Sequence, residues 1–218
     1  MTLTSDLKTK YSDLWEKVVT HPFILEMGDG NLPQRTFRRY FVQDYAVVGD
    51  IAAIVAYGIA KAPDFDGAAV LNRFMNGILN PENEIFLDAF RDFQASPEEL
   101  ADKKPSTDAF GDFLVRTGLE GNFVDIVTVL YVTEGTYMDW AIRLMGANKK
   151  PGIKAYQAWI DIHGPEVLGE VVEYLGGYLD NQTTAEQRPR IERLFQKSLR
   201  YEYRFFEAAY RGEEWPNG

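Results

Sequence analysis

Three acidic residues occupy positions that the helical pattern of this sequence reserves for apolar side chains. Asp44, Glu134 and Glu202 each lie on the apolar stripe of a different predicted long helix. Burying a carboxylate costs several kcal/mol unless it is paired or neutralised, and burial raises its pKa toward the range useful for acid–base catalysis. Because facing helices of a bundle build ligand sites between them, the three acids predict a polar site inside a helical core.

Each acid also has an interpretation without chemistry. A lone acid on an apolar stripe often lies at a helix end or pairs with a neighbour. Asp44 can pair with Tyr40 or Gln43, and Glu202 can pair with Arg200 or Arg204 in the same way. Aromatic residues crowd the same segments: Tyr40, Phe41, Tyr45, Tyr131, Tyr137, Tyr201, Tyr203, Phe205 and Phe206. They are most simply core side chains, and they can equally wall a flat aromatic ligand.

The sequence offers little to a metal or cofactor. It contains two histidines and no cysteine, which excludes disulfide scaffolds, zinc ribbons, iron–sulfur clusters and thiol nucleophiles. Di-iron carboxylate bundles need Glu-x-x-His pairs. Here Val18 stands three residues before His21, and Ile160 holds the same place before the second histidine. His21, beside a proline, is more simply a satisfied histidine than a haem ligand. We therefore expect no metal and no cofactor.

Length and charge limit the classes of protein that the sequence allows. The chain has 218 residues, is 45% hydrophobic and carries a formal net charge of -10. These values suit one globular domain, residues 1–218, that buries roughly 70% of the surface of its unfolded chain. The acidic balance argues against partners such as nucleic acid or an anionic membrane. Residues 1–17 show no signal-peptide pattern, and no apolar run approaches the ~18 residues that span a bilayer. We expect a soluble, cytoplasmic protein.

Apolar spacing predicts an all-α fold of seven to nine helices, because no period-2 alternation indicates strands. The main predicted helices cover residues 7–18, 33–59, 66–93, 106–117, 123–146, 153–160, 167–178 and 191–209. We expect the Asn80-Pro81 pair to kink the third of them.

Turn and cap residues delimit these helices. Ser96 with Glu99 has the capping-box spacing and is followed by a proline, which predicts a short helix there. Thr183 with Glu186 suggests the cap of the last helix. The segment 28–31, Gly-Asp-Gly-Asn, predicts a turn before the second helix.

Motifs in order along nearly the whole chain carry a family resemblance. They are Trp15-Glu16, His21-Pro22-Phe23, Gly28-Asp29-Gly30-x-Leu32-Pro33, Phe37-x-x-Tyr40-x-x-Gln43-Asp44-Tyr45, Gly121-Asn122-Phe123, Tyr156-x-x-Trp159-Ile160 and Tyr201-Glu202-Tyr203-x-Phe205-Phe206-x-x-Ala209-Tyr210. With them the sequence resembles the TenA family, known as thiaminase II or aminopyrimidine aminohydrolase. The Gln-Asp-Tyr stretch together with the C-terminal Glu-x-x-Phe is fairly specific.

The resemblance implies both a fold and a reaction. The fold is a haem oxygenase-like helical bundle, usually assembled as a homotetramer, with a dimer as the other expected homo-oligomer. The reaction is hydrolysis at the aminomethyl carbon of a 4-aminopyrimidine, which yields hydroxymethylpyrimidine during salvage of thiamin breakdown products. By the same resemblance Asp44 binds the aminopyrimidine, Glu202 acts as acid and base, and Tyr137 lies close to the reacting group.

The chain departs from the cysteine branch of the family at the nucleophile. That branch has a cysteine four residues before the tyrosine that matches Tyr137, where this chain has Thr133. Glu134 gives a Glu-x-x-Tyr pattern similar to the cysteine-free branch, which is expected to act on amino- or formylaminopyrimidines and poorly on thiamin. Expelling a thiazolium then lacks a covalent route, whereas carboxylates can still activate water and protonate a leaving amine. Thr133 is not expected to be a nucleophile, because the sequence indicates no neighbouring residue as a base dedicated to its hydroxyl group.

Two further departures concern the substrate pocket. Tyrosines that stack on the substrate ring in the cysteine branch fall here at Val47 and His163. Val47 cannot stack, whereas His163 can stack while adding a titratable donor. Both are expected to contact the substrate, which therefore need not be identical to that of the cysteine branch.

Together these features predict a hydrolase of an aminomethyl- or formylaminomethyl-pyrimidine. Glu202 and Glu134 share the general acid and base roles in either order, and Tyr137 orients the leaving nitrogen. Asp44 accepts hydrogen bonds from the amino group and ring of the substrate. The alternative is a non-catalytic protein that binds a pyrimidine or another flat metabolite on the same fold. A third reading, an oxygen-using enzyme of that fold, suffers from the shortage of histidines.

Overall fold

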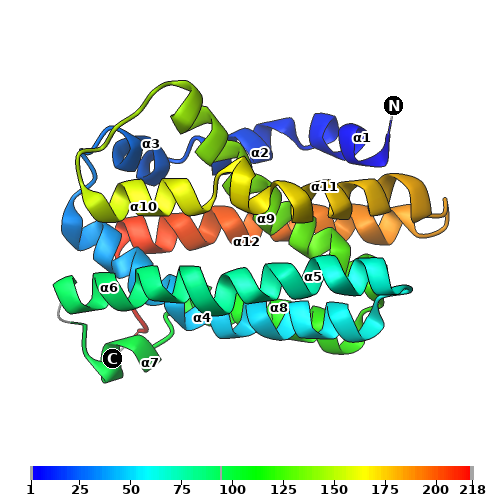
Figure 1. Cartoon of the computed structure of the whole chain (residues 1–218), viewed down its shortest axis with the longest axis horizontal. Coiled ribbons are helices and arrows are strands. Elements are labelled where there is room, and N and C mark those ends of the chain that lie inside the picture. Colours follow the sequence, from blue (N-terminus) through cyan, green and yellow to red (C-terminus); the bar gives the residue numbers. More distant parts are fainter. Residues whose placement is uncertain (1, 94, 217–218) are drawn as a thin grey trace.

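The structure is a computed structural model that describes residues 2–93 and 95–216. These residues form helices and the connections between them (Figure 1). In chain order they are α1 (Leu3–Lys10), α2 (Ser12–Val19), α3 (Pro22–Gly28), α4 (Gln34–Lys61), α5 (Phe65–Gly77), a π-helical turn η1 (Ile78–Glu82), α6 (Asn83–Phe93), α7 (Pro97–Ala101), α8 (Pro105–Glu120), α9 (Phe123–Gly146), α10 (Lys154–Ile162), α11 (Pro165–Gln182) and α12 (Arg188–Arg211). No strand occurs in these residues, which confirms the predicted all-α class. The predicted domain ends, residues 1 and 218, lie outside the described residues.

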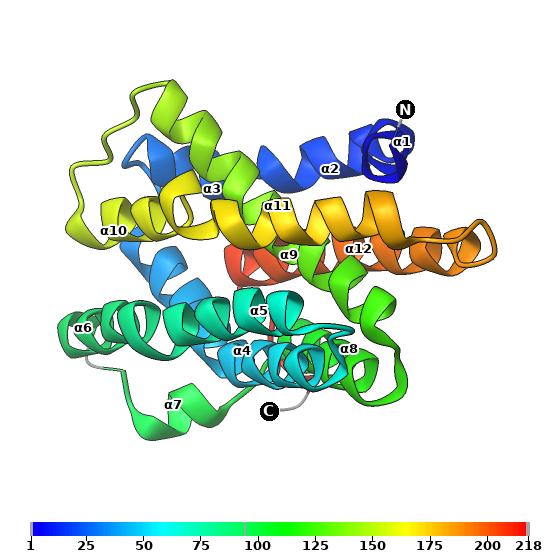
Figure 2. The same cartoon turned by 45° about the vertical axis from the view of Figure 1, so that its right-hand side comes forward.

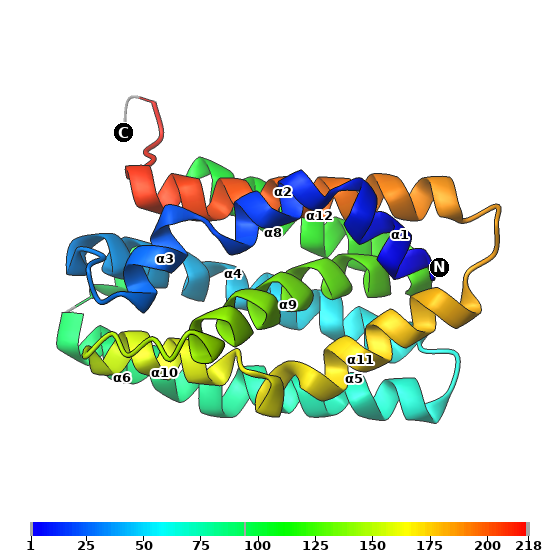
Figure 3. The same cartoon turned by 90° about the horizontal axis from the view of Figure 1, so that it is seen from above.

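Three long helices, α4, α9 and α12, form the centre of the bundle. α9 is buried continuously over residues 123–136, as expected for a helix that is apolar on all sides. It packs against α11, α12 and α4, and in Figure 3 it crosses the middle of the molecule. In Figures 1 and 2, α5 and α6 run end to end along one side of the bundle. The helices that carry the three predicted acids are therefore mutually packed.

The length and composition of α4 bear on the expectation that no apolar run approaches the length of a membrane span. It is the one described helix long and apolar enough to cross a membrane by length and composition. Core helices pass the same test, and α4 packs against α5, α8 and α12. It also carries Asp44 and Asp50 in its middle. α4 therefore packs into the bundle on one face, with 39% of its apolar window buried.

The Asn80-Pro81 pair lies inside the π-helical turn η1, between α5 and α6. Proline has no N–H to donate to the preceding turn of an α-helix, and the wider π turn accommodates it there. The predicted helix over 66–93 is thus present as three consecutive helical segments, with its irregularity at the predicted place. Such π turns occur frequently at functional sites.

Two of the predicted local signals are confirmed. Ser96 and Glu99 form the capping box of α7: the Ser96 N–H donates to Glu99 Oε2 at 2.9 Å, and the Glu99 N–H donates to Ser96 Oγ at 3.3 Å. The turn after α3 contains Gly30 at φ 72°, where an added Cβ would overlap the Pro151 carbonyl oxygen. Glycine is therefore required there both by conformation and by space.

Other local predictions are wrong. The single helix over 7–18 is divided at Tyr11 into α1 and α2. α3 was not anticipated; it begins at Pro22, after His21 has capped it by accepting a hydrogen bond from the Phe23 N–H. Thr183 follows α11 and does not cap α12, which starts after Gln187 without a side-chain cap. Short helices of this kind raise the number of α-helices in the described residues to twelve, above the predicted seven to nine.

Candidate active site

A cavity of about 220 Å³ lies between α4, α5, η1, α9, α11 and α12. It is lined by all six residues predicted for the site: Asp44, Val47, Glu134, Tyr137, His163 and Glu202. The sites of drug-sized ligands typically span about 300–1,000 Å³, so this cavity suits a smaller molecule. The structure therefore brings together every side chain that the sequence proposed for one site.

Helical spacing explains how these side chains reach the cavity. Val47 follows Asp44 by three residues on α4, and Tyr137 follows Glu134 by three residues on α9. Residues three apart share one face of a helix, so each pair points the same way. At the start of α9, Asn122 and Asp125 form a capping box that fixes where the helix begins.

Burial perturbs the acidity of the three predicted carboxyl groups. Asp44, Glu134 and Glu202 are only 5%, 8% and 1% exposed. Burial raises the pKa of Asp44 to about 8, although the Tyr40 hydroxyl works in the opposite direction. Burial likewise raises the pKa of Glu134 to about 7, and burial with the negative charges of its two neighbours raises that of Glu202 well above its ordinary range. Some of these groups therefore hold protons at neutral pH, as acid–base catalysis requires.

Of the pairings that would make these acids merely structural, the one between Asp44 and Tyr40 is present, whereas those with Gln43, Arg200 and Arg204 are not observed. Within the described residues Glu202 Oε2 is buried without a hydrogen-bond partner, while Arg200 and Arg204 are exposed. The Gln43 side chain does not pair with Asp44 but binds the backbone of the loop that follows α7. Within the part of the chain that the structure describes, Asp44 and Glu202 thus form no ion pair that would favour their ionised forms.

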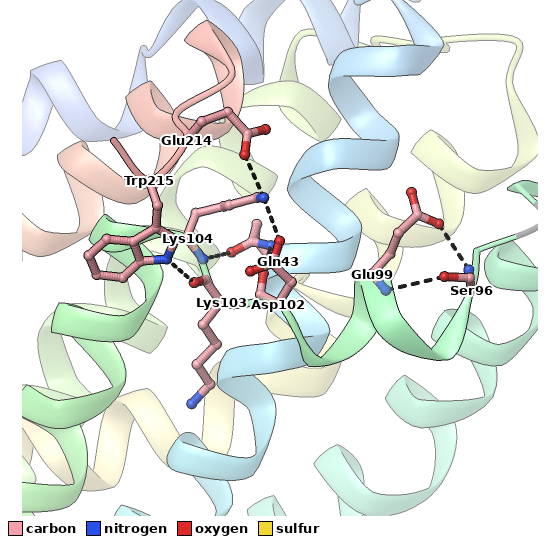
Figure 4. Close-up of polar contacts among 8 residues, drawn as sticks. All are labelled: Gln43, Ser96, Glu99, Asp102, Lys103, Lys104, Glu214 and Trp215. Atoms are coloured by element: carbon pink, nitrogen blue, oxygen red, sulfur yellow. Dashed lines mark hydrogen bonds and ion pairs between the residues drawn. The ribbon is translucent and has the colours of Figure 1, made fainter. Parts of the chain in front are cut away.

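Gln43 forms hydrogen bonds that connect this loop to the turn of α4 next to Asp44 (Figure 4). Its Nε2 donates to the Asp102 carbonyl at 2.9 Å, and its Oε1 accepts from the Lys104 N–H at 2.8 Å. The indole N–H of Trp215, near the end of the chain, donates to the Lys103 carbonyl at 2.9 Å. Because Gln43 precedes Asp44 directly, the loop and the C-terminal segment stabilise the backbone behind the site.

Tyr137 is linked to a second tyrosine. The hydroxyl groups of Tyr137 and Tyr40 lie 2.8 Å apart. Burial raises the pKa of both phenols well above their ordinary value, so both remain protonated at neutral pH. Since Tyr40 also interacts with Asp44, the two phenols connect the acid on α4 with the cavity face of α9.

His163 differs from the expectation of a titratable donor. Its Nδ1–H donates to the Trp159 carbonyl at 2.7 Å. Burial lowers the pKa of His163 to about 4, so the ring is neutral at physiological pH and Nε2 is a hydrogen-bond acceptor. The ring lies 4.8 Å from that of Tyr137, centroid to centroid, and 4.4 Å from that of Trp159. It presents an acceptor and an aromatic edge to the cavity rather than a mobile proton.

Thr133 also lines the cavity, and it has a neighbour that the sequence analysis did not recognise. The Thr133 hydroxyl lies 3.1 Å from Glu134 Oε1 and 3.1 Å from the Leu130 carbonyl. Glu134 is thus a carboxyl group in direct contact with Thr133, and the expectation that Thr133 is not a nucleophile stays a prediction. The hydroxyl has one proton for these two acceptors, and its contact with Oε1 helps to orient the Glu134 carboxyl group.

Glu82 is the site residue that the sequence analysis missed. It lies at the end of η1, is partly buried and lines the cavity. A signal existed, because Glu82 falls four residues after Ile78 on the same apolar stripe of the predicted helix over 66–93. The expected kink at Pro81 concealed it, since a kink interrupts the stripe.

Contacts decide two further alternatives from the sequence, those for the crowded aromatic residues and for His21. Of the nine crowded aromatic residues, Tyr137 and Phe205 line the cavity, and the others form the aromatic core around it. His21 is a satisfied histidine: Nδ1 accepts from the Phe23 N–H at 3.1 Å, and Nε2 lies 3.0 Å from Glu207 Oε2.

Comparison with known proteins identifies the family of the chain. A family model described as TENA/THI-4/PQQC matches residues 9–212. The chain belongs to this family. Among curated TenA-type relatives, "Aminopyrimidine aminohydrolase" of Bacillus subtilis is 28% identical over 99% of this chain and 92% of its own. The protein with the same description from Halalkalibacterium halodurans is 24% identical over 99% and 98%. The family resemblance predicted from the sequence motifs is thereby confirmed.

Solved structures of similar proteins have the same fold. A TenA homologue from Pyrococcus horikoshii superposes with a TM-score of 0.86 at 23% identity, covering 97% of this chain and all of its own. A domain of unknown function with a haem oxygenase-like fold, from Shewanella denitrificans, reaches 0.74 at 15% identity over 96% and 92%. The predicted haem oxygenase-like bundle is therefore confirmed.

Proposed function

We propose that this TENA/THI-4/PQQC family member hydrolyses an aminomethyl- or formylaminomethyl-pyrimidine to hydroxymethylpyrimidine in thiamin salvage. The observation that carries the proposal is the convergence of Asp44, Glu134 and Glu202 on one small cavity. Full-length relatives described as aminopyrimidine aminohydrolases support the choice of reaction.

The proposed reaction replaces nitrogen by oxygen at one carbon. Water forms a bond to the aminomethyl carbon while the carbon–nitrogen bond breaks, and nitrogen leaves with the electron pair, as ammonia from the amine or as formamide from its N-formyl derivative. One carboxylate takes the proton of the attacking water, and a protonated carboxyl group supplies a proton to the leaving group where one is needed. Glu134 and Glu202 provide this pair, because their raised pKa values leave a proton available between them at neutral pH.

The other residues hold the substrate. Asp44 accepts a hydrogen bond from the 4-amino group, and its protonated carboxyl group donates one to the neighbouring ring nitrogen. Tyr137 orients the nitrogen that leaves. His163 offers Nε2 as an acceptor, and Val47, 1% exposed, provides apolar contact where a stacking ring is absent. A neutral acceptor-rich wall of this kind favours a ligand that donates hydrogen bonds, as an aminopyrimidine does.

The purely binding alternative is not favoured. A ligand-holding site gains nothing from several buried carboxyl groups whose pKa values approach neutrality, whereas acid–base catalysis needs them. The relatives described as aminohydrolases point the same way.

We also propose that the protein is a single domain, that it is soluble and cytoplasmic, and that it forms a homo-oligomer, either a tetramer or a dimer. Large apolar side chains on the surface, such as Phe65 (93% exposed), support association with further copies. Light scattering of the purified protein measures this directly, and a monomer at micromolar concentration would contradict it.

Release of ammonia from 4-amino-5-aminomethyl-2-methylpyrimidine tests the reaction. The wild type is expected to release ammonia and hydroxymethylpyrimidine in equal amounts, while Glu202→Gln and Asp44→Asn lose at least about 100-fold of the activity. Glu173→Gln, at an exposed position on α11, is the control and should retain wild-type activity. Wild-type protein that binds the pyrimidine but forms no product over hours would favour the binding alternative instead.

A further inference from the structure

Glu82 gives the cavity a fourth carboxyl group that the proposed chemistry does not use. It reaches the cavity from η1, on a wall different from those of Asp44, Glu134 and Glu202. Burial and the negative charges of Asp44 and Glu134 raise the pKa of Glu82 well above its ordinary range. In the empty cavity these effects favour the protonated form of Glu82, whereas a positively charged ligand beside it would favour the ionised form.

A second observation also points to a ligand that donates hydrogen bonds. Glu202, 1% exposed, faces the same cavity, and its Oε2 has no hydrogen-bond partner within the described part of the chain. Leaving a buried carboxylate oxygen unsatisfied is costly. A ligand with N–H groups in the cavity supplies the missing donor.

The charges that line the cavity do not balance. Among the described lining residues Arg73 is the one cationic side chain, and its Nε donates to Glu170 Oε2 at 3.0 Å, both side chains being more than half exposed. His163 is neutral at physiological pH because burial lowers its pKa. No cation among these lining residues favours the ionised form of the buried carboxyl groups, so a positively charged ligand would supply that interaction and take the place of the protons they hold. No three metal-ligating side chains in residues 2–93 and 95–216 come close enough to hold a metal ion, so an organic cation fits better.

We propose that Glu82 binds the protonated aminomethyl group of the substrate and makes the cationic amine the preferred substrate over its neutral N-formyl derivative. The inference rests on the proposed function of the same cavity. A primary alkylamine such as lysine has a pKa of about 10.4 and is charged at neutral pH, whereas formylation removes that charge. Glu82 is thus a specificity-determining residue, distinct from the pair assigned to proton transfer.

The interaction has a kinetic signature. The nitrogen is positively charged in the bound substrate and becomes neutral ammonia as it leaves, so Glu82 stabilises the ground state at least as well as the transition state. Interactions of this kind lower KM without raising kcat. Removing the charge of Glu82 should therefore raise KM for the amine and leave kcat nearly unchanged.

Substrate discrimination by Glu82→Gln tests the proposal. We expect KM for 4-amino-5-aminomethyl-2-methylpyrimidine to rise at least about 10-fold, the effect of losing a hydrogen bond between charged groups, with kcat within about 3-fold. KM for the N-formyl derivative should change less than about 3-fold. Glu84→Gln, two residues away and exposed on α6, is the matched control. Equal losses for both substrates, or no loss for either, would overturn the proposal.

Direct binding keeps this test separate from the test of the reaction. Calorimetry should show that Glu82→Gln weakens binding of the amine at least about 10-fold and binding of neutral hydroxymethylpyrimidine less than about 3-fold. Glu82→Asp keeps the charge, so it should retain the preference for the amine, and loss of the preference in that variant would contradict the proposal. If wild-type protein turns over neither pyrimidine, the proposed function fails, while these binding constants still decide the role of Glu82.

Discussion

Replacing Glu134 by glutamine should stabilise the protein at alkaline pH while it removes activity. Burial raises the pKa of Glu134 from 4.5 to about 7. The folded state therefore holds a proton that the unfolded state has lost, and the stability contributed by this group falls as pH rises from about 4.5 through about 7. Since each pKa unit corresponds to about 1.4 kcal/mol, the ionised Glu134 costs about 3 kcal/mol above pH 8.

Most of this free-energy cost appears over a pH range in which stability can be measured. About 2 kcal/mol of that cost falls between about pH 5.5 and about pH 8.5, which avoids the isoelectric point near 4.8. Glutamine cannot ionise and still accepts the hydrogen bond from Thr133. Loss of the charge also lowers the pKa values of Asp44 and Glu202, which Glu134 raises. That relief adds stability in the same direction.

Urea denaturation at fixed protein concentration measures the effect. The free energy of unfolding of Glu134→Gln relative to wild type should increase by at least about 2 kcal/mol from pH 5.5 to pH 8.5. The exposed Glu84→Gln variant should show no pH-dependent difference from wild type. Parallel curves for wild type and Glu134→Gln would refute the reasoning, because they would mean that Glu134 has an ordinary pKa in the folded protein.

Three further predictions concern the scaffold of the site. Gly30→Ala places a side chain at φ 72° against the Pro151 carbonyl, so the free energy of unfolding should fall by more than about 1 kcal/mol; an unchanged urea midpoint would contradict this. Asn122→Ala removes the cap of α9 and should cost about 1 kcal/mol in the same assay, whereas Asn122→Asp should cost little. Gln43→Ala leaves the Lys104 N–H without its acceptor, so hydrogen exchange there should accelerate at least about 10-fold; unchanged protection would show that the loop is held by other contacts.

The predicted part of the site follows from helical periodicity. The apolar stripes of three helices include Asp44, Glu134 and Glu202. All side chains on a core-facing stripe point into the core, whether they are apolar or acidic. Three acids on three mutually packed helices therefore lead to one cavity. The spacing of Glu134 and Tyr137 also fixes their shared face, whatever the remainder of the fold is.

The missed features depend on contacts or helix types that spacing does not encode. Glu82 reaches the cavity through a π turn, and the choice between a kink and a π turn at Pro81 is made by packing against neighbouring helices. The division of the first helix occurs at Tyr11, whose hydroxyl donates to Glu192 at 2.7 Å, a partner 181 residues away.

The protonation state of His163 was missed for a similar reason. Its neutrality follows from its depth of burial, while its Nδ1–H donates to the Trp159 carbonyl of α10, the helix that His163 directly follows. The identity of the residue shows that a titratable ring is present, but the surroundings decide that it acts as an acceptor.

The origin of the oxygen in the product tests the central claim most directly. Purified protein is incubated with 4-amino-5-aminomethyl-2-methylpyrimidine in water enriched in ¹⁸O, and the product is fragmented by mass spectrometry. We predict one ¹⁸O atom on the hydroxymethyl carbon, the ring amino group intact, and no product from Glu202→Gln beyond the background without enzyme. Oxygen at the ring carbon in place of the 4-amino group, or no product from wild-type protein, would contradict hydrolysis at the aminomethyl carbon by the carboxylates of this cavity.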